Sequence, residues 1–238
     1  MTAASHTPPG SGATPPVLAI DGPSGSGKGT VSRMLAQRLG WRLLDSGALY
    51  RLAALAGQQA GLAADDQAGH ARLARLLDIR FEAEPDGAER ILLGGEAVTD
   101  RVRSETAGMG ASRVAAWPAL RAALLDRQRD FARAPGLVAD GRDMGTVVFP
   151  EAPLKIFLTA SAEERARRRY NQLKDKDSGV SLAALSREVE ARDRQDANRA
   201  VSPLRPAGDA ITIDSTRLDA DEVVERIWQL GRERGLWG

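Results

Sequence analysis

The chain has 238 residues, of which 42% are hydrophobic and 27% charged, and its formal net charge is +1. This composition is typical of a soluble globular protein, and no stretch approaches the roughly 18 apolar residues of a membrane-spanning helix. Cysteine is absent and histidine occurs twice, which excludes disulfides and thiol chemistry and leaves almost no room for a histidine-dependent triad or a zinc cluster.

The N-terminal segment 1–16 is rich in small residues and proline and lacks the apolar core of a signal peptide. We therefore predict that it is a disordered tail and not a targeting segment. The absence of cysteine fits a reducing compartment, so we expect the protein to be cytoplasmic.

The first predicted strand, at 17–21, leads into a glycine-rich loop with the sequence GPSGSGKGT at 22–30. Glycines let successive backbone N–H groups turn toward a polyphosphate, and the lysine of the loop can reach its β and γ oxygens. A helix is predicted next, because apolar residues recur at helical spacing from Val31 to Leu39 and Gly40 can end it. Strand, loop and helix together predict a site for a nucleoside triphosphate.

One position departs from the commonest form of this loop. The residue after Lys28 is Gly29, where serine or threonine usually supplies a hydroxyl to Mg²⁺, and Thr30 follows one step later. A GKGT ending is typical of kinases for nucleotides and small metabolites. We therefore favour a kinase over a GTPase.

Further strands are predicted at 41–44, 137–140, 154–159 and 210–214, with helical patterns between them. This alternation predicts a parallel sheet wrapped by helices, in which ligands bind at the carboxyl ends of the strands. Three of those ends are polar: Asp21, Asp45-Ser46-Gly47 and Asp140-Gly141-Arg142-Asp143.

Between about 78 and 100 the pattern changes to that of a small antiparallel insert, with turns at Pro85-Asp86-Gly87 and Gly94-Gly95. The remaining helices are predicted at about 104–116, 118–134 and 219–234.

Charged side chains give a second chemical signal. Arg51 either faces the site or is solvated, and the pair Arg142-Asp143 either serves chemistry or forms a stabilising salt bridge. One helix face is predicted to carry Arg192, Asp196 and Arg199, which are spaced at i, i+4 and i+7. This face is either a solvated ladder of ion pairs or a surface that binds phosphoryl groups. Because a phosphate loop is present, we favour the functional interpretation, since phosphoryl transfer depends on positioning and charge neutralisation.

Five motifs in fixed order make the chain similar to the bacterial cytidylate kinases over about residues 17–215. They are AIDGPSGSGKGT at 19–30, LLDSGALYR at 43–51, ASRVAAWPALR at 111–121, ADGRDMGTVVFPEAPLKIFL at 139–158 and RDRQDANRA at 192–200. The resemblance implies transfer of the γ-phosphoryl group of ATP to CMP or dCMP, giving ADP and CDP or dCDP, with Mg²⁺.

The resemblance also implies a three-layer α/β/α P-loop kinase domain over 17–238, with a five-stranded parallel sheet and three parts. The core would cover about 17–45, 113–167 and 201–238. A lobe for the nucleoside monophosphate, carrying the antiparallel insert, would cover about 46–112, and a helical lid about 168–200.

Site residues follow from the same resemblance. The residues expected to hold ATP are Gly22, Pro23, Ser24, Gly25, Ser26, Gly27, Lys28, Gly29 and Thr30. Those expected around CMP are Ser46, Arg51, Ser112, Arg121, Arg142, Asp143, Arg192, Asp196 and Arg199. The expected catalytic charges are Lys28, Arg142, Arg168 and Arg192. The family often has an arginine where Gln195 stands, which puts one lid contact in doubt.

Hydrogen-bond polarity supports cytosine as the base. Cytosine offers an amino donor at N4 and acceptors at N3 and O2, whereas uracil has an acceptor at position 4 and a donor at N3. Asp143 accepting from N4, with Arg121 donating to N3 or O2 and Ser112 assisting, would leave buried polar groups unpaired when UMP binds.

The mechanism needs no general base, because the attacking phosphate is already an anion near neutral pH. We expect in-line attack on the γ-phosphorus, with Lys28 and the arginines neutralising charge and a closing lid excluding water. Magnesium is expected to be held by phosphates and water, with Thr30 as a further candidate, and no side chain is assigned as a metal ligand.

Three alternatives remain. The first is a P-loop kinase for UMP, AMP or a non-nucleotide alcohol, which would need a base. The second, a nucleotide-driven switch or motor, lacks an NKxD motif or an ABC-type signature. The third, a nucleic-acid-binding protein using arginines near position 167, is disfavoured by the near-neutral charge and few aromatics. We therefore expect small-molecule substrates, no nucleic acid, no membrane and a monomer.

Overall fold

The centre of the molecule is a five-stranded parallel sheet with the strand order β2-β6-β1-β7-β8. This computed structural model describes residues 14–83, 89–174 and 181–238. The expected turn at 85–87, most of the expected tail and part of the expected lid lie outside these ranges. The five strands match the predicted ones within one residue: β1 (Val17–Asp21), β2 (Arg42–Asp45), β6 (Leu137–Gly141), β7 (Leu154–Thr159) and β8 (Ile211–Asp214).

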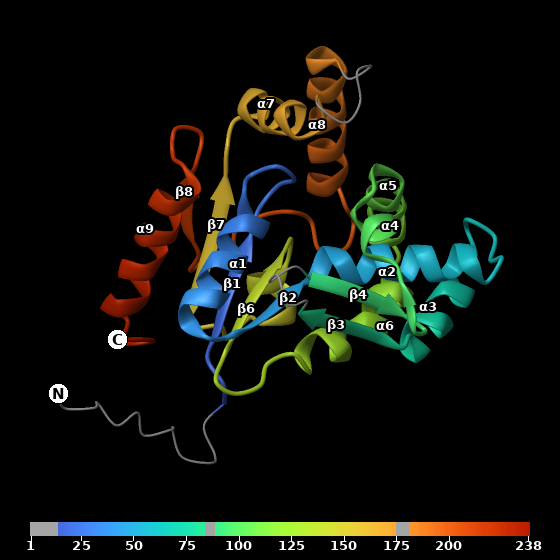
Figure 1. Cartoon of the computed structure of the whole chain (residues 1–238), viewed down its shortest axis with the longest axis horizontal. Helices are drawn as coiled ribbons and strands as arrows, with labels where there is room; N and C mark the ends of the chain where they lie inside the picture. Colours follow the sequence, from blue (N-terminus) through green and yellow to red (C-terminus); the bar gives the residue numbers. More distant parts are fainter. Residues whose placement is uncertain (1–13, 84–88, 175–180) are drawn as a thin grey trace.

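Both faces of the sheet are covered, because β1 and β6 are apolar runs buried along their whole length. On one face Leu18 and Ile20 of β1 belong to a core with side chains of α1 (Lys28–Leu39) and α9 (Ala220–Glu233). On the other face Val17 and Ala19 belong to a core with η1 (Met144–Val148), a wide π-type helical turn after β6. The result is the expected α/β/α arrangement (Figure 1).

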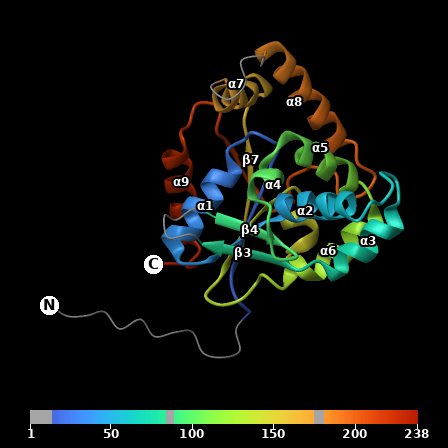
Figure 2. The same cartoon turned by 45° about the vertical axis from the view of Figure 1, so that its right-hand side comes forward.

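A second lobe lies beside the sheet, on the right in Figure 1 and in front in Figure 2. Its apolar core includes Leu52, Val114 and Leu124 and meets one of the cores on the sheet at Ile79 and Phe81. The predicted antiparallel insert is confirmed as β3 (Ile79–Ala83), β4 (Glu89–Leu93) and β5 (Glu96–Ala97). The helices of this lobe are α2 (Ser46–Gln59), α3 (Gln67–Leu76), α4 (Thr99–Arg103), α5 (Glu105–Val114) and α6 (Pro118–Arg129).

Two further helices stand above the carboxyl ends of the strands, at the top of Figure 1. They are α7 (Ala162–Leu173), which begins just after β7, and α8 (Leu182–Ala197). The two helices pack against each other, and α8 leans toward α5 of the second lobe (Figure 2). Among the described residues, no helix is long and apolar enough to cross a membrane.

Two predicted helix ends were wrong. The helix predicted at 118–134 ends at Arg129, because the N–H groups of Phe131 and Ala132 turn back to carbonyls three residues earlier and tighten the chain. The helix carrying Arg192 ends at Ala197, so Arg199 lies beyond it and not on the same helix face. Arg199 still reaches Asp196 through an ion pair.

Candidate active site

The glycine-rich loop connects β1 to α1 at the carboxyl edge of the sheet. A β-carbon at residue 22 would lie 2.0 Å from the carbonyl oxygen of Leu158, and Gly27 has a φ of +93° where α1 begins. Both positions therefore require glycine. Lys28 is the first residue of α1, is only 8% exposed, and donates from Nζ to the carbonyl of Pro23 at 3.1 Å. The loop thus surrounds its lysine and the N-terminal end of α1 as an anion site would.

Asp140, at the end of β6, lies next to this lysine and was not assigned a role from the sequence. Burial raises the pKa of Asp140 to about 7, and burial lowers the pKa of Lys28 to about 8. Within the described part of the chain, Oδ1 of Asp140 has no hydrogen-bond partner. A β-carbon at residue 29 would lie 3.3 Å from Oδ2 of Asp140. The unusual Gly29 therefore leaves room for this carboxylate.

Asp21, at the end of β1, is a second buried carboxylate without an assigned role. Its two oxygens accept hydrogen bonds at 2.8 Å from the backbone N–H groups of Met144 and Gly145, the first two residues of η1. Burial raises the pKa of Asp21 to about 6. Asp21 thereby ties η1 to the central strand and fixes the chain immediately after Arg142 and Asp143.

Arg142 and Asp143 lie at the centre of a buried charge cluster that joins three elements. Arg142 donates to Asp196 of α8 at 3.1 Å, and Asp196 also pairs with Arg199. Asp143 pairs with Arg121 of α6. Asp143 and Asp196 are 3% and 1% exposed, so these carboxylates depend on their arginine partners for stability. The structure thus brings together five of the residues expected around CMP: Arg121, Arg142, Asp143, Asp196 and Arg199.

The predicted residues of the second lobe face the same region. Asp45 accepts from the N–H of Ala48 and so caps α2, which places Ser46 at the first position of that helix. A β-carbon at Gly108 of α5 would lie 3.7 Å from Nη1 of Arg192 and 3.8 Å from Nη2 of Arg51. Arg51 and Arg192 therefore approach each other from different lobes.

Ser112 and Gln195 meet between α5 and α8. Ser112 is buried, and its carbonyl oxygen accepts from Nε2 of Gln195 at 3.4 Å. Gln195 therefore makes a contact between α8 and the second lobe. The side-chain amide of Gln195 is neutral, so it donates to the carbonyl of Ser112 without adding charge to the site.

Arg168 lies at the glycine loop, but its donors contact protein atoms. Its guanidinium donates to the carbonyl of Ser26 at 3.1 Å and to the carbonyl of Ser215 at 2.6 Å, and it pairs with Glu164. Arg165, which was not among the predicted site residues, donates to the carbonyl of Ser24 at 3.1 Å. The two arginines of α7 thus hold the glycine loop in place through hydrogen bonds to its carbonyl groups.

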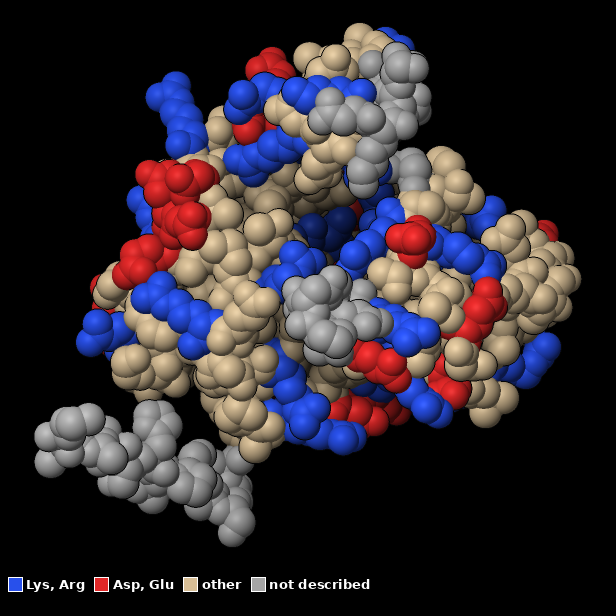
Figure 3. Space-filling model, viewed as in Figure 1, with Lys and Arg blue, Asp and Glu red and all other residues tan. Residues whose placement is uncertain are grey.

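A hollow of about 1400 Å³ lies between the carboxyl edge of the sheet, the second lobe and the helices α7 and α8. Figure 3 shows it as a dark opening with lysine and arginine side chains in its wall. The predicted residues Ser24 to Thr30, Arg51, Ser112, Arg168 and Arg192 line it, together with Asp45 and Gln195. The hollow is large enough for two nucleotides in contact.

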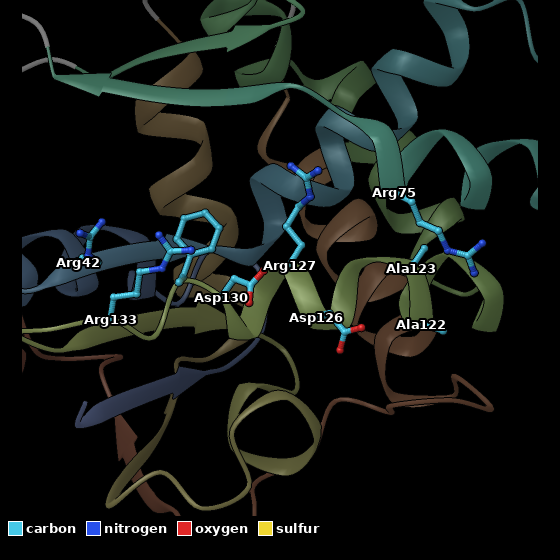
Figure 4. Close-up of a pocket in the computed structure, with 9 residues that line it drawn as sticks. Arg42, Arg75, Ala122, Ala123, Asp126, Arg127, Asp130 and Arg133 are labelled. Carbon is cyan, nitrogen blue, oxygen red and sulfur yellow. The ribbon is translucent and has the colours of Figure 1, made fainter. Parts of the chain in front are cut away.

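A second hollow, of about 650 Å³, lies on α6 at the edge of the sheet (Figure 4). Arg42 and Arg133 lie together at one end of it, and Arg75 of α3 lies at the other. Asp126 and Asp130 also line it, and no residue of the glycine loop does. The phosphate-binding features therefore belong to the larger hollow.

Comparisons with known proteins agree with the geometry. The family model described as "Cytidylate kinase" matches residues 18–233. A cytidylate kinase of Pseudomonas fluorescens (strain Pf0-1) is 63% identical over 213 residues, which cover 89% of this chain and 93% of that protein. A cytidylate kinase of Pseudomonas syringae pv. syringae (strain B728a) is 60% identical over 224 residues, which cover 94% and 98% of the two chains.

Proposed function

The chain belongs to the cytidylate kinase family, and from this premise we propose that it transfers the γ-phosphoryl group of ATP to CMP or dCMP, giving ADP and CDP or dCDP. The observation that carries the proposal is that a phosphate loop and the side chains of Arg51, Ser112 and Arg192 line one hollow. The buried cluster around Arg142 and Asp143 lies close to it, because the charge of Arg142 acts on Lys28 of the loop. The loop suits a phosphoryl donor, and the cluster suits a pyrimidine monophosphate. UMP, AMP or a small alcohol is the alternative acceptor.

The donor half of the site is formed by residues 22–30, which we propose hold the phosphates of ATP. Their backbone N–H groups and the ammonium of Lys28 neutralise charge on the β and γ oxygens. Mg²⁺, when bound, would supply further neutralisation of those oxygens. The buried Oδ1 of Asp140, which lacks a partner among the described residues, fits a ligand of this ion or of its water, with Thr30 as the other candidate.

The acceptor half gathers arginines from three parts of the chain. Arg51, Arg142 and Arg192 can neutralise the CMP phosphate and the transferring group, while Asp196 orients Arg142. Asp196 also orients Arg199. The attacking oxygen is an anion near neutral pH, so these residues need only position it and offset charge repulsion.

Base selection is proposed for Asp143, Arg121 and Ser112. The Arg121–Asp143 ion pair is nearly inaccessible, with side-chain exposures of 10% and 4%. Such a pair presents a carboxylate acceptor beside a guanidinium donor, which matches cytosine N4 and N3 and opposes uracil at both atoms.

We propose the same three-part division for the enzyme. Helices α2 to α5 of the second lobe fall within the expected range 46–112, and α6 completes its core. Closure of a lid at about 168–200 would exclude water from the γ-phosphoryl group. Both halves of the site come from one chain, which supports a monomer. The absence of cysteine suits the reducing cytoplasm, where we propose the enzyme acts.

A panel of acceptors tests the function. ADP release from ATP is measured with CMP, dCMP, UMP, AMP, shikimate or no acceptor. We expect rapid release with CMP or dCMP and slow release with the others. Equal rates with CMP and UMP would refute the base assignment, and fastest release with an alcohol would refute the proposed reaction.

A further inference from the structure

A buried amide that the proposed mechanism does not use lies beneath the acceptor half of the site. Gln128 of α6 is 2% exposed and Ser46 of α2 is 3% exposed. Oγ of Ser46 donates to Oε1 of Gln128 at 2.8 Å, and Nε2 of Gln128 donates to the carbonyl of Leu124 at 3.3 Å. Two buried polar side chains from different helices therefore satisfy each other.

Chemistry fixes the direction of the bond between Ser46 and Gln128. The carbonyl of Leu124 can only accept, so the amide nitrogen of Gln128 must face it and the amide oxygen must face Ser46. An amide oxygen has no proton to give. The Ser46 hydroxyl therefore donates its single proton to Gln128, and only its lone pairs remain for a bound molecule.

Gln128 also contacts the base-selecting cluster at a second point. Its side chain lies beside the phenol of Tyr50, and burial raises the pKa of that phenol to about 12, so it stays neutral. The guanidinium of Arg121 lies 5.6 Å from the centre of the Tyr50 ring, and Arg121 pairs with Asp143. Gln128 thus connects Ser46 to the residues proposed to select the base.

We propose that Ser46, which is expected beside CMP, faces the pyrimidine and that Gln128 is a positioning residue for base selection: by taking the proton of Ser46, it leaves that hydroxyl as an acceptor. An acceptor pairs with the amino group of cytosine and opposes the carbonyl of uracil. Without Gln128 the hydroxyl is free to rotate and donate to uracil. The inference rests on the proposed function, and Gln128 acts through Ser46 without touching the substrate.

The substitution Gln128→Met tests this, because methionine has a similar shape and no hydrogen-bonding amide. We expect the ratio of kcat/KM for CMP to kcat/KM for UMP to fall about tenfold, as one mismatched hydrogen bond would give. A general packing defect would lower both values and leave the ratio unchanged. The matched control is Gln229→Met, an exposed position on α9, which should leave the ratio unchanged.

Two further variants make the test decisive. In a Ser46→Ala background, Gln128→Met should change the ratio by less than about twofold, since its route to the base is gone. Gln128→Glu, protonated by burial, can still donate to Leu124 and accept from Ser46, so it should keep the ratio within about twofold. If Gln128→Met does not fold, the test rests on Gln128→Glu. A tenfold fall in the ratio of kcat/KM for CMP to kcat/KM for UMP in Gln128→Glu would overturn the proposal.

The outcomes separate this inference from the function on which it rests. If the wild-type enzyme does not prefer CMP to UMP, the proposed function fails in its base assignment. If the wild type prefers CMP and Gln128→Met keeps that preference, only the role of Gln128 is overturned.

Discussion

At the scale of single residues, Lys28 is the side chain on which the donor half depends most. The substitution Lys28→Met should lower kcat by about a hundredfold or more, because one preorganised charge on the transferring group is worth about 3 kcal/mol. The matched control is Lys174→Met, an exposed lysine at the end of α7. Near-normal turnover of Lys28→Met would refute the role of the lysine.

The pH dependence of the enzyme follows from the same residue. Burial lowers the pKa of Lys28 to about 8, and only the ammonium form neutralises phosphate. The value of kcat/KM for ATP, measured at saturating CMP, should therefore fall above about pH 8, by about tenfold per pH unit. Bound phosphates favour the ammonium, so kcat should hold to higher pH. In Lys28→Arg, whose guanidinium stays charged, kcat/KM for ATP should not fall over this pH range. If kcat/KM for ATP of the wild type stayed constant up to pH 10, the account would be contradicted.

Asp143 gives the corresponding prediction for the acceptor half. Asp143→Ala removes the proposed acceptor for cytosine and leaves the nearly buried Arg121 without its partner. We expect kcat/KM for CMP to fall about a hundredfold and the Kd for ATP, measured by calorimetry, to change less than about twofold. Asp126→Ala, at an exposed position of α6, is the control. Equal losses for both substrates would contradict a role in base selection.

Some of the proposed site residues were predictable from the sequence because the motif around each of them indicates its chemical role. Lys28 sits in a glycine frame, and Arg142 and Asp143 follow a strand end. Asp21 and Asp140 also end strands, but their roles depend on the N–H groups of η1 and on the gap left by Gly29. Such contacts join residues far apart in the chain, which spacing alone does not show.

At the scale of elements, the contact between α7 and α8 ties α8, the helix of the proposed lid, to the rest of the chain. Arg165 of α7 is 5% exposed, pairs with Asp193 of α8 and donates to the glycine loop. Asp193→Ala leaves this buried guanidinium without its carboxylate, so opening of α8 should become easier by about 2 kcal/mol. Hydrogen exchange of α8 amides should then be about thirtyfold faster.

A surface variant on the same helix provides the control. Glu190 is more than half exposed and lies 3.7 Å from Arg194, so Glu190→Ala should leave exchange within about twofold. Similar exchange rates in the two variants would contradict a specific role for the Arg165–Asp193 pair.

Strand positions were more predictable than helix ends. The strands of the parallel sheet are short runs rich in apolar residues, and burial on both faces of the central strands β1 and β6 leaves little freedom in their limits. The end of α6 depends on tightened hydrogen bonds after Arg129, and the end of α8 on the return of Arg199 to Asp196. Neither feature has a strong local signal in the sequence.

At the scale of the whole molecule, the sheet order places the glycine loop, the end of β6 and the start of α7 at the carboxyl edge of the sheet. The neighbours of β1 are β6 and β7, so the donor loop lies between the strand that leads to Arg142 and the strand that leads to α7. This topology brings the donor and acceptor halves together although about 170 residues separate Lys28 from Arg199 in the chain. The predicted order of strands and helices anticipated a site at this edge, but not which carboxylates are buried in it.

The most direct test of a CMP kinase is a competition between acceptors for one labelled phosphoryl group. ATP labelled in its γ-phosphate is mixed with equal amounts of CMP and UMP, and the label in each product is measured. We predict label in CDP that exceeds label in UDP by about a hundredfold or more, because a mismatched base leaves buried groups unpaired. Equal label in CDP and UDP, or label only in inorganic phosphate, would contradict the account.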